Sequence, residues 1–364
     1  MTQPLLLQQL HAFGVDISSG ELSRLLTGGH EGFHAETDAV LRAGVEVSTY
    51  LNVDDTSARH QGKNGYCLYV GSQYFAWYQS GLTKDRLNFI TVLWSASPCP
   101  DYRVDAVAVE YLHARGASQW LIERFTYQAV TSLPDEASWE AYLKARVIVE
   151  ADEVRLVTEA ARLASLVAQG WLQGTAILSD GAGQFAILYH ALCWIHAERA
   201  LRRLVPPGPV QRQAQARVLD EVWKYYRALK AYQQSPQAEQ AAHLRAQFDA
   251  LCLQTTGYHA LDKALGRLHQ NKAELLRVLE RPDIPLHNNA AEEGLRDIVK
   301  KRKVSAGTYS ELGRTCRDHF ASLKKTCLKL RVPFLEYLRD RIFQRRAIPP
   351  LADLIRMRAA AHAT

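Results

Sequence analysis

Paired cysteines and long apolar runs are the first features that this sequence lacks. Its six cysteines are scattered and form no CxxC pair, which argues against a disulfide framework or a zinc ribbon and favours free thiols in a reducing cytoplasm. No uninterrupted apolar run approaches the roughly 18 residues of a membrane span. The first residues, "MTQPLLLQQLHAFG", lack the basic stretch and cleavage site of a signal peptide. We therefore expect a cytoplasmic protein without a membrane partner.

Positive charge is concentrated in one part of the chain. The 364 residues carry a net charge of +6 and, with 47% hydrophobic and 23% charged residues, have the composition of an ordinary soluble protein of two or three domains. Between Arg296 and Arg346, 15 Lys and Arg stand against 5 Asp and Glu. Localised positive charge predicts a phosphate-binding face, although charge alone fits a solvated lysine-rich helix equally well.

Residues 4–29 are predicted to form two short helices broken at "FGVDIS". Ser18 and Glu21 have the spacing of a capping box that opens the second helix. The pattern resembles the latter part of a helix-turn-helix, and a plain helical hairpin explains it at least as well.

Strands and helices are predicted in separate stretches further along. Residues 45–53, "VEVSTYLNV", alternate with the period of a strand, "GYCLYVG" and "QYFAWYQS" indicate a hairpin, and "TAILSD" (175–180) indicates a short buried strand. Much of 104–170 has a helical pattern. From about 185 to 281 the pattern is almost wholly helical, beginning with "FAILYHALCWIHAERALRRLV". The sequence therefore predicts an α/β protein with a long helical stretch before a basic helical end.

Two predicted strands end in aspartates. Asp54 and Asp55 close the alternating strand, and by parity Asp54 continues its polar face. Asp180 ends the second strand and is followed by glycine, a frequent site position in α/β folds. Taken alone, each of these acids is more often part of a turn than of a catalytic site.

Glu292 stands at the start of a predicted basic helix. Asn289 and Glu292 have the spacing of a capping box, in which Asn289 is the N-cap and Glu292 only satisfies free amides. Glu292, Arg296, Lys300 and Lys303 also lie along one stripe of a helix. One acid followed by three cations on the same face suits a metal-bound phosphodiester with flanking phosphates.

His190, Cys193 and His196 have HxxCxxH spacing, which would place them near one helical stripe and suits a zinc site. No fourth ligand is evident, and Leu192 and Trp194 crowd the same turn. A packing and hydrogen-bonding role is therefore favoured for the three. The alternative is that His196 and Arg199 support Asp180.

Three ordered motifs carry a resemblance to a known family. "LNVDDT", "AILSDGAGQF…HALCWIHAERALRRL" and "HNNAAEEGLRDIVKKRK" are similar to DDE-type bacterial insertion-sequence transposases of the IS66 type, over roughly residues 45–345. The resemblance implies an RNase H-like mixed sheet flanked by helices, with a large all-helical insertion before the third acidic residue. The implied segments are a helical N-terminal segment (1–44), the first part of the core (45–200), the helical insertion (201–281), the last part of the core with DNA-facing helices (282–346) and a C-terminal tail (347–364).

The resemblance also implies a function. The chain would be a DNA transposase that cuts at transposon ends and transfers the freed strand into target DNA. Asp54, Asp180 and Glu292 would be the catalytic residues and hold Mg²⁺, for which Mn²⁺ substitutes. Arg296, Lys300, Arg302 and Lys303 would bind DNA, with Asn289, His196 and Arg199 supporting the acids. The implied partners are DNA at the transposon ends and target, further copies of the chain in a synaptic complex, and helper proteins of the same element, with the protein on the nucleoid when bound.

The sequence departs from the family pattern at two points. Glu293 stands where the family usually has arginine after its third acid. The chain also begins inside the helix-turn-helix-like part without the family's cysteine-rich element, so we expect weak recognition of specific ends. Two alternatives stay open: a DNA-binding derivative that no longer cuts, and an RNase H-like nuclease that hydrolyses DNA but never joins it.

Overall fold

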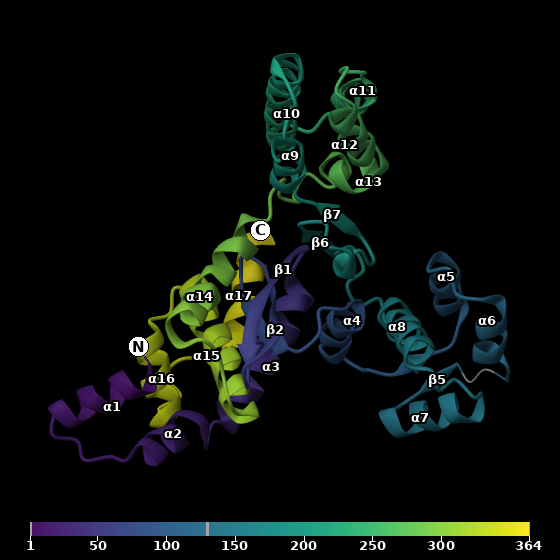
Figure 1. Ribbon diagram of the computed structural model, residues 1–364. Helices are drawn as coiled ribbons and strands as arrows, with labels where there is room; N and C mark the ends of the chain where they lie inside the picture. The colour runs from purple at the N-terminus through teal and green to yellow at the C-terminus, as the bar shows by residue number, and fades with distance from the viewer. Residues whose placement is uncertain (1, 129–130, 364) are drawn as a thin grey trace. The chain divides into compact units, whose positions relative to one another are not determined.

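The computed structural model describes residues 2–128 and 131–363 as a mixed α/β chain (Figure 1). The chain divides into two compact units. The first comprises Met1–Ser48, Asp55–Gly174 and Glu293–Thr364, and the second comprises Thr49–Asp54 and Thr175–Glu292. None of the helices in the described ranges combines the length and the apolar composition that crossing a membrane requires.

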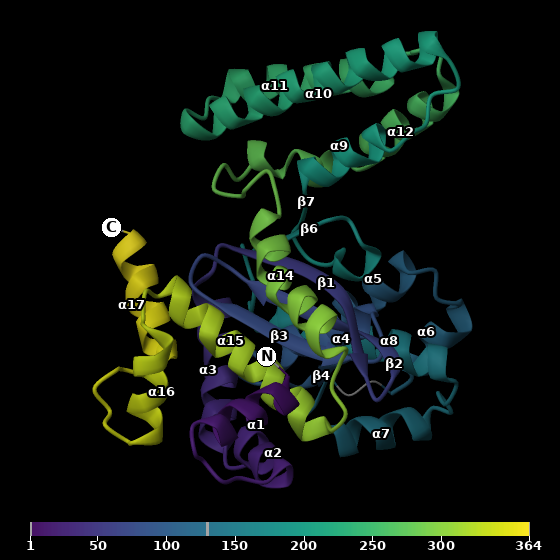
Figure 2. The same cartoon turned by 60° about the vertical axis from the view of Figure 1, so that its left-hand side comes forward.

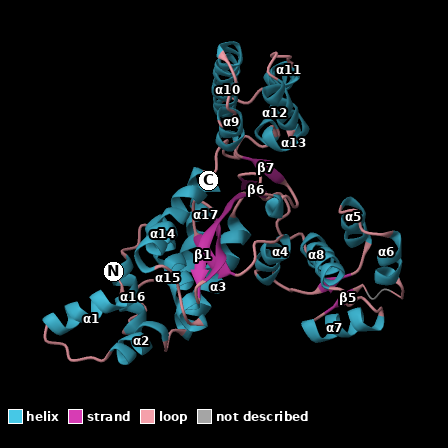
Figure 3. Ribbon diagram, viewed as in Figure 1, coloured by secondary structure: helices cyan, strands magenta, loops and turns pink. Residues whose placement is uncertain are grey.

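A mixed five-stranded sheet has the strand order β3-β2-β1-β6-β7. Figure 3 shows strands in magenta and helices in cyan. β2 and β3 pair antiparallel, whereas β6 pairs in parallel with both β1 and β7. The predicted hairpin is confirmed as β2 and β3, and the predicted strand at 175–180 is confirmed as β6. The strands are β1 (Tyr50–His60), β2 (Lys63–Gly71), β3 (Ala76–Gly81), β6 (Ala176–Ser179) and β7 (His190–Leu192).

The predicted strand at 45–53 is wrong in its bounds. Helix α3 (Glu31–Val47) covers its first part, and β1 begins only at Tyr50. The buried positions of α3 explain the difference, because Thr37, Val40, Leu41 and Gly44 recur with helical rather than strand spacing. β1 then continues past the two aspartates to a two-residue turn, Gln61–Gly62, whose φ values of 50° and 75° suit a tight hairpin into β2.

The predicted N-terminal helices are confirmed as α1 (Gln3–Ala12) and α2 (Ser19–Thr27). Ser18 precedes α2, and its hydroxyl accepts a hydrogen bond from the backbone N–H of Glu21 at 3.1 Å. This bond satisfies one of the free amides of the first turn.

Small residues on α8 (Ala151–Ala168) allow close packing in the middle of the first unit. Ala160, Ala161 and Ala164 are fully buried in a cluster that includes Tyr102 and Trp139, whose rings stack with centroids 4.7 Å apart. The helical prediction for 104–170 is largely confirmed, with a short two-stranded sheet as an interruption. The elements here are α4 (Arg86–Ser95), β4 (Tyr102–Arg103), α5 (Ala106–Ala114), α6 (Gln119–Thr126), β5 (Ser132–Leu133) and α7 (Glu136–Ala145).

Helix α15 (Glu311–Lys329) covers the free edge of β3 (Figure 2). Asp318, Ser322 and Thr326 accept hydrogen bonds from the backbone N–H groups of Ser80, Tyr78 and Ala76, at 2.7, 3.0 and 3.1 Å. Every fourth residue of a helix recurs after about 6 Å, and every second residue of a strand after about 6.6 Å. Because these two repeats nearly match, successive turns of α15 place one side chain opposite each outward-facing amide of β3. These bonds prevent the edge strand from pairing with another chain. Two further helices of the first unit are α16 (Phe334–Ile342) and α17 (Leu351–Ala363).

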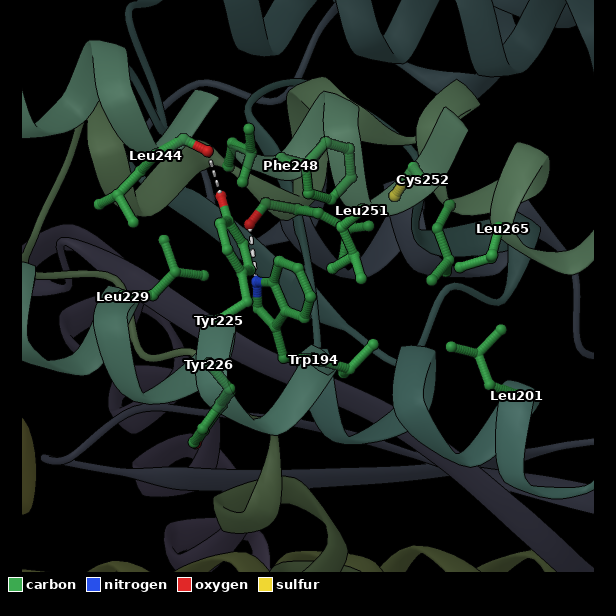
Figure 4. Packing of buried hydrophobic residues seen from close by; sticks show 14 of the residues in the cluster. Trp194, Leu201, Tyr225, Tyr226, Leu229, Leu244, Phe248, Leu251, Cys252 and Leu265 are labelled. Atoms are coloured by element: carbon green, nitrogen blue, oxygen red, sulfur yellow. Dashed lines mark hydrogen bonds between the residues drawn. The ribbon is translucent and has the colours of Figure 1, made fainter. Parts of the chain in front are cut away.

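Helices α9 to α13 share a core of their own in the second unit. Trp194 lies at its centre, where its indole N–H donates to the carbonyl of Leu275, and the Tyr225 hydroxyl donates to the carbonyl of Leu244, both at 2.9 Å (Figure 4). The helical stretch is thus confirmed from Trp194 onward. The helices are α9 (Trp194–Arg202), α10 (Pro209–Gln234), α11 (Ala238–Leu253), α12 (His259–Gln270) and α13 (Lys272–Leu275), with 3₁₀ turns at Gly183–Phe185 and Arg277–Leu279.

The contact between α15 and β3 yields a test of stability. Replacing Thr326 with valine keeps the shape but leaves the buried N–H of Ala76 unpaired, so we expect the free energy of unfolding to fall by about 2 kcal/mol in urea titrations. Thr326→Ser keeps the hydroxyl and loses one methyl group, so a loss of about 1 kcal/mol is expected. A serine variant less stable than the valine variant would show that the hydroxyl is not what stabilises this edge.

Candidate functional site

Two of the predicted acids follow paired positions of neighbouring strands. In the parallel pairing of β1 and β6, Asn52 is the partner of Leu178. Asp54 and Asp180 each follow two residues later, so the same register aligns them across strands about 4.8 Å apart. The prediction that Asp54 lies at a strand end is wrong, because β1 runs on to His60, whereas Asp180 does follow directly after β6.

Asp180 belongs both to a turn and to the wall of a cavity. Its Oδ1 accepts a hydrogen bond from the N–H of Ala182 at 2.9 Å, and Gly181 between them has a φ of +98°. Only glycine adopts such a backbone readily. The cavity has a volume of about 430 Å³, and His196, Lys263 and Arg267 also line it. Asp180 therefore shares a mainly apolar cavity wall with two cationic side chains, Lys263 and Arg267, which suit a phosphate-containing ligand.

A buried amide fixes the start of α14 (Asn289–Ser305) against β1. The Asn288 side chain accepts a hydrogen bond from Asn52 at 2.9 Å and donates one to the carbonyl of Val53 at 2.8 Å. Its backbone N–H donates to the Cys193 sulfur at 3.2 Å, and Asn288 itself is only 1% exposed. Asn52 and Asp54 share one face of β1, so this bond orients the strand face that carries the acid.

Asn289, which the sequence favours as N-cap and supporting residue, is the first residue of α14 and is exposed. The carbonyl that accepts the first helical bonds, from the N–H groups of Ala291 and Glu292, belongs to Asn288. The predicted N-cap was therefore wrong by one residue. Two adjacent asparagines give no signal in the sequence as to which is buried.

Glu292 faces α9. Its Oε1 accepts a hydrogen bond from the Arg199 guanidinium at 2.7 Å and lies 3.4 Å from the His196 Nε2. The hydrogen bond to Glu292 raises the pKa of Arg199 above its usual range. His196 and Arg199 were expected to support Asp180, and the structure places the hydrogen bond of Arg199 on Glu292 instead. The alternative, in which Glu292 closes a capping box at the start of α14, gains no support, because Oε1 of Glu292 accepts from Arg199.

The HxxCxxH residues do not share a helical stripe. His190 lies in β7, Cys193 precedes α9, and only His196 is helical, because residues 190–192 pair with β6 rather than continuing a helix. The His190 Nε2 is 2.9 Å from the Ser179 hydroxyl, and burial lowers the pKa of His190 to about 4. Within the described residues, no three His, Cys, Asp or Glu side chains are placed to hold a metal ion as they stand.

Comparison with known proteins decides the family. Residues 138–315 match the model of the transposase IS66 family. The chain is also 42% identical to an uncharacterized protein of Sinorhizobium fredii, y4jO, over 324 residues, which cover 88% of this chain and 100% of that protein. This chain belongs to the transposase IS66 family. No solved structure matches it significantly.

The IS66 family match includes Asp180 and Glu292 and begins after Asp54. Asp55, the neighbour of Asp54, forms an ion pair with Lys84 at 3.0 Å, and its side chain is 8% exposed. The carboxylate of Asp55 is therefore engaged by a cation of the protein itself. Glu293, the departure from the family pattern, is exposed on α14.

Three of the four predicted DNA-binding cations are exposed on α14 of this IS66-family chain. Arg296, Lys300 and Lys303 form no ion pair with any described residue. Arg302 differs, because its guanidinium donates to the carbonyl and hydroxyl oxygens of Ser57. Arg302 is therefore better placed to hold α14 to β1 than to bind a phosphate.

The structural role assigned to Asn288 can be measured directly. Asn288→Ala leaves the Asn52 amide and the Val53 carbonyl buried without their partner, so we expect a loss of about 2–4 kcal/mol in the free energy of unfolding. The matched change Asn289→Ala removes an exposed amide and should stay within about 0.5 kcal/mol of the parent. Equal losses in the two variants would contradict the assignment to Asn288.

Proposed function

We propose that this IS66-family protein is a DDE transposase that cuts DNA at transposon ends and transfers the freed 3′ end into target DNA. The observation that carries the proposal is the parallel pairing of β1 with β6, in which Asn52 is the partner of Leu178 and Asp54 and Asp180 each follow two residues later. Glu292 supplies a third carboxylate one helical turn beyond Asn288, whose side chain contacts β1. The antiparallel strands β3-β2-β1 followed by parallel β6 and β7 suit the RNase H-like core that we assign to it.

The chemistry of the three acids fits a divalent cation. Carboxylate oxygens are the ligands that Mg²⁺ and Mn²⁺ prefer, and Glu292 already pairs with a cationic group, Arg199. Asp54, Asp180 and Glu292 would hold the ions, which activate the attacking oxygen and stabilise the leaving one. Arg199 and His196 orient Glu292, and the cationic wall of the Asp180 cavity, Lys263 and Arg267, binds phosphates beside the reacting strand.

DNA is the partner that this function requires. The exposed stripe of Arg296, Lys300 and Lys303 would bind the backbone of the duplex, since it carries unpaired positive charge along a single helix face. Synapsis of two ends would bring together further copies of the chain, with helper proteins of the same element as additional partners.

One observation favours a second candidate, a DNA-binding derivative that no longer cuts. Arg199 occupies an oxygen of Glu292 that a metal ion would need. Such a protein would bind DNA without metal-dependent nicking. A nuclease that only hydrolyses would nick DNA but leave no product joined to target DNA. A nicking assay and a strand-transfer assay together therefore separate all three.

The catalytic assignment is tested by conservative substitution. Asp54→Asn, Asp180→Asn and Glu292→Gln each remove a negative charge that metal binding requires, so each should reduce Mg²⁺- or Mn²⁺-dependent nicking of supercoiled DNA to background. Duplex affinity and thermal stability should stay close to those of the parent. Glu293→Gln is the matched control on α14 and should keep its activity. An Asp180→Asn variant that nicks like the parent would exclude this mechanism.

The DNA-binding stripe is tested by salt dependence. Replacing Arg296, Lys300 and Lys303 with alanine should flatten the slope of log affinity against log salt by about 0.9 for each lost phosphate contact. The same loss of charge on α10, through Arg212→Ala, Arg227→Ala and Lys230→Ala, should leave the slope unchanged. If the α14 variant keeps the parental slope, these three residues are not part of the interface.

A further inference from the structure

A second concave site lies in the first unit, among the basic helices. It is a cavity of about 400 Å³ formed by α14, α15, the start of α16 and the ring of Tyr78 from β3. This volume is within the range of pockets that bind small ligands. Apolar groups form much of its wall, including Ile298, Leu328, Val332 and Phe334. We call it the lysine-lined pocket, because four lysines also line it: Lys300, Lys301, Lys324 and Lys325.

The four lysines form no ion pairs with the described residues. Within the described part of the chain, none of their ammonium groups forms an ion pair or a hydrogen bond, and a single acid, Asp297, shares the pocket with them. Partial burial, followed by the positive charges of Lys324 and Arg317, lowers the pKa of Lys301. Like charges held around one cavity repel each other, and a bound anion would relieve this repulsion.

The walls of the pocket restrict which anion would bind. Apolar side chains beneath a ring of cations suit a ligand with a flat apolar body and a charged edge. Phe334 is half-buried and stacks on Tyr337 with the ring planes 21° apart, while the Tyr78 ring is held by a hydrogen bond from its hydroxyl to the Gly294 carbonyl at 2.8 Å. Nucleobases stack on such aromatic surfaces, and phosphates bind lysines. Within a duplex the bases are already stacked, so only an unpaired base is available for this pocket.

We propose that the lysine-lined pocket binds one unpaired nucleotide of a DNA strand, with its base against the apolar wall and its phosphates on the four lysines. The proposal rests on the proposed function, because Lys300 belongs to both the pocket and the exposed stripe of α14. An acidic peptide would satisfy the lysines but gives no reason for the aromatic wall. DNA that is frayed or cut at a transposon end provides such nucleotides.

The test compares a blunt duplex with the same duplex carrying a short unpaired 3′ extension. Stacking of one base on an aromatic wall should strengthen binding of the extended duplex by about tenfold in fluorescence anisotropy at fixed salt. Lys324→Ala/Lys325→Ala and Phe334→Ala should each bring the ratio of the two affinities close to one while the blunt duplex still binds. Arg339→Ala/Arg345→Ala removes the same charge from exposed positions on and after α16 and should preserve the ratio.

The other possible outcomes contradict either the pocket proposal or the proposed function. If the parent protein binds both duplexes equally, the pocket proposal fails while the proposed function stands. If it binds neither duplex, the proposed function fails. If poly-glutamate displaces the extended duplex from the parent at concentrations that leave the blunt duplex bound, the pocket selects acidic peptides and the nucleotide assignment is wrong. Phe334→Trp keeps an aromatic surface and should retain the preference, so its loss in that variant would also contradict the stacking.

Discussion

The buried amide of Asn288 is the constraint on which the candidate site depends. Residues 52 and 288 are far apart in sequence, yet their side chains form a hydrogen bond at 2.9 Å in a region where neither reaches water. A buried amide without a partner costs about 1–3 kcal/mol, so the start of α14 has one favourable position against β1. Glu292 follows Asn288 by four residues and therefore lies on the same face of the helix, next to Arg199.

The edge of the sheet depends on a similar constraint in the first unit. Side chains of α15 at every fourth residue accept the outward-facing amides of β3, so the helix and the strand fix each other's register. The same helix contributes Lys324 and Lys325 to the lysine-lined pocket. The packing of α15 thus determines where those two positive charges lie.

Local patterns were sufficient to predict part of this arrangement. Asp180 after a short apolar strand, the β2–β3 hairpin and the long helical stretch all follow from periodicity and turn residues within a few positions of each other. The predictions failed where contacts between residues distant in the sequence determine the secondary structure. Val45 and Val47 fit a strand pattern but belong to α3, and His190 fits a helical pattern but pairs in β7 because β6 lies beside it.

The candidate site residues likewise divide into those that local patterns predict and those that only distant contacts reveal. Asp55 pairs with Lys84, a contact that no local sequence pattern predicts, and Asp54 stays the proposed acid. Asn288 and Asn289 are identical in type, and only the fold shows which one is buried. The pairing of Arg199 with Glu292 joins helices 93 positions apart, beyond the reach of any spacing rule.

The central claim is that Asp54, Asp180 and Glu292 together hold divalent ions. Electron paramagnetic resonance of Mn²⁺ titrated into the protein measures this directly, without DNA and without turnover. The account predicts that the parent binds Mn²⁺, that two bound ions couple magnetically at a spacing of about 4 Å, and that Asp180→Asn abolishes the coupling. Identical Mn²⁺ spectra and affinities for the parent and Asp180→Asn would contradict it.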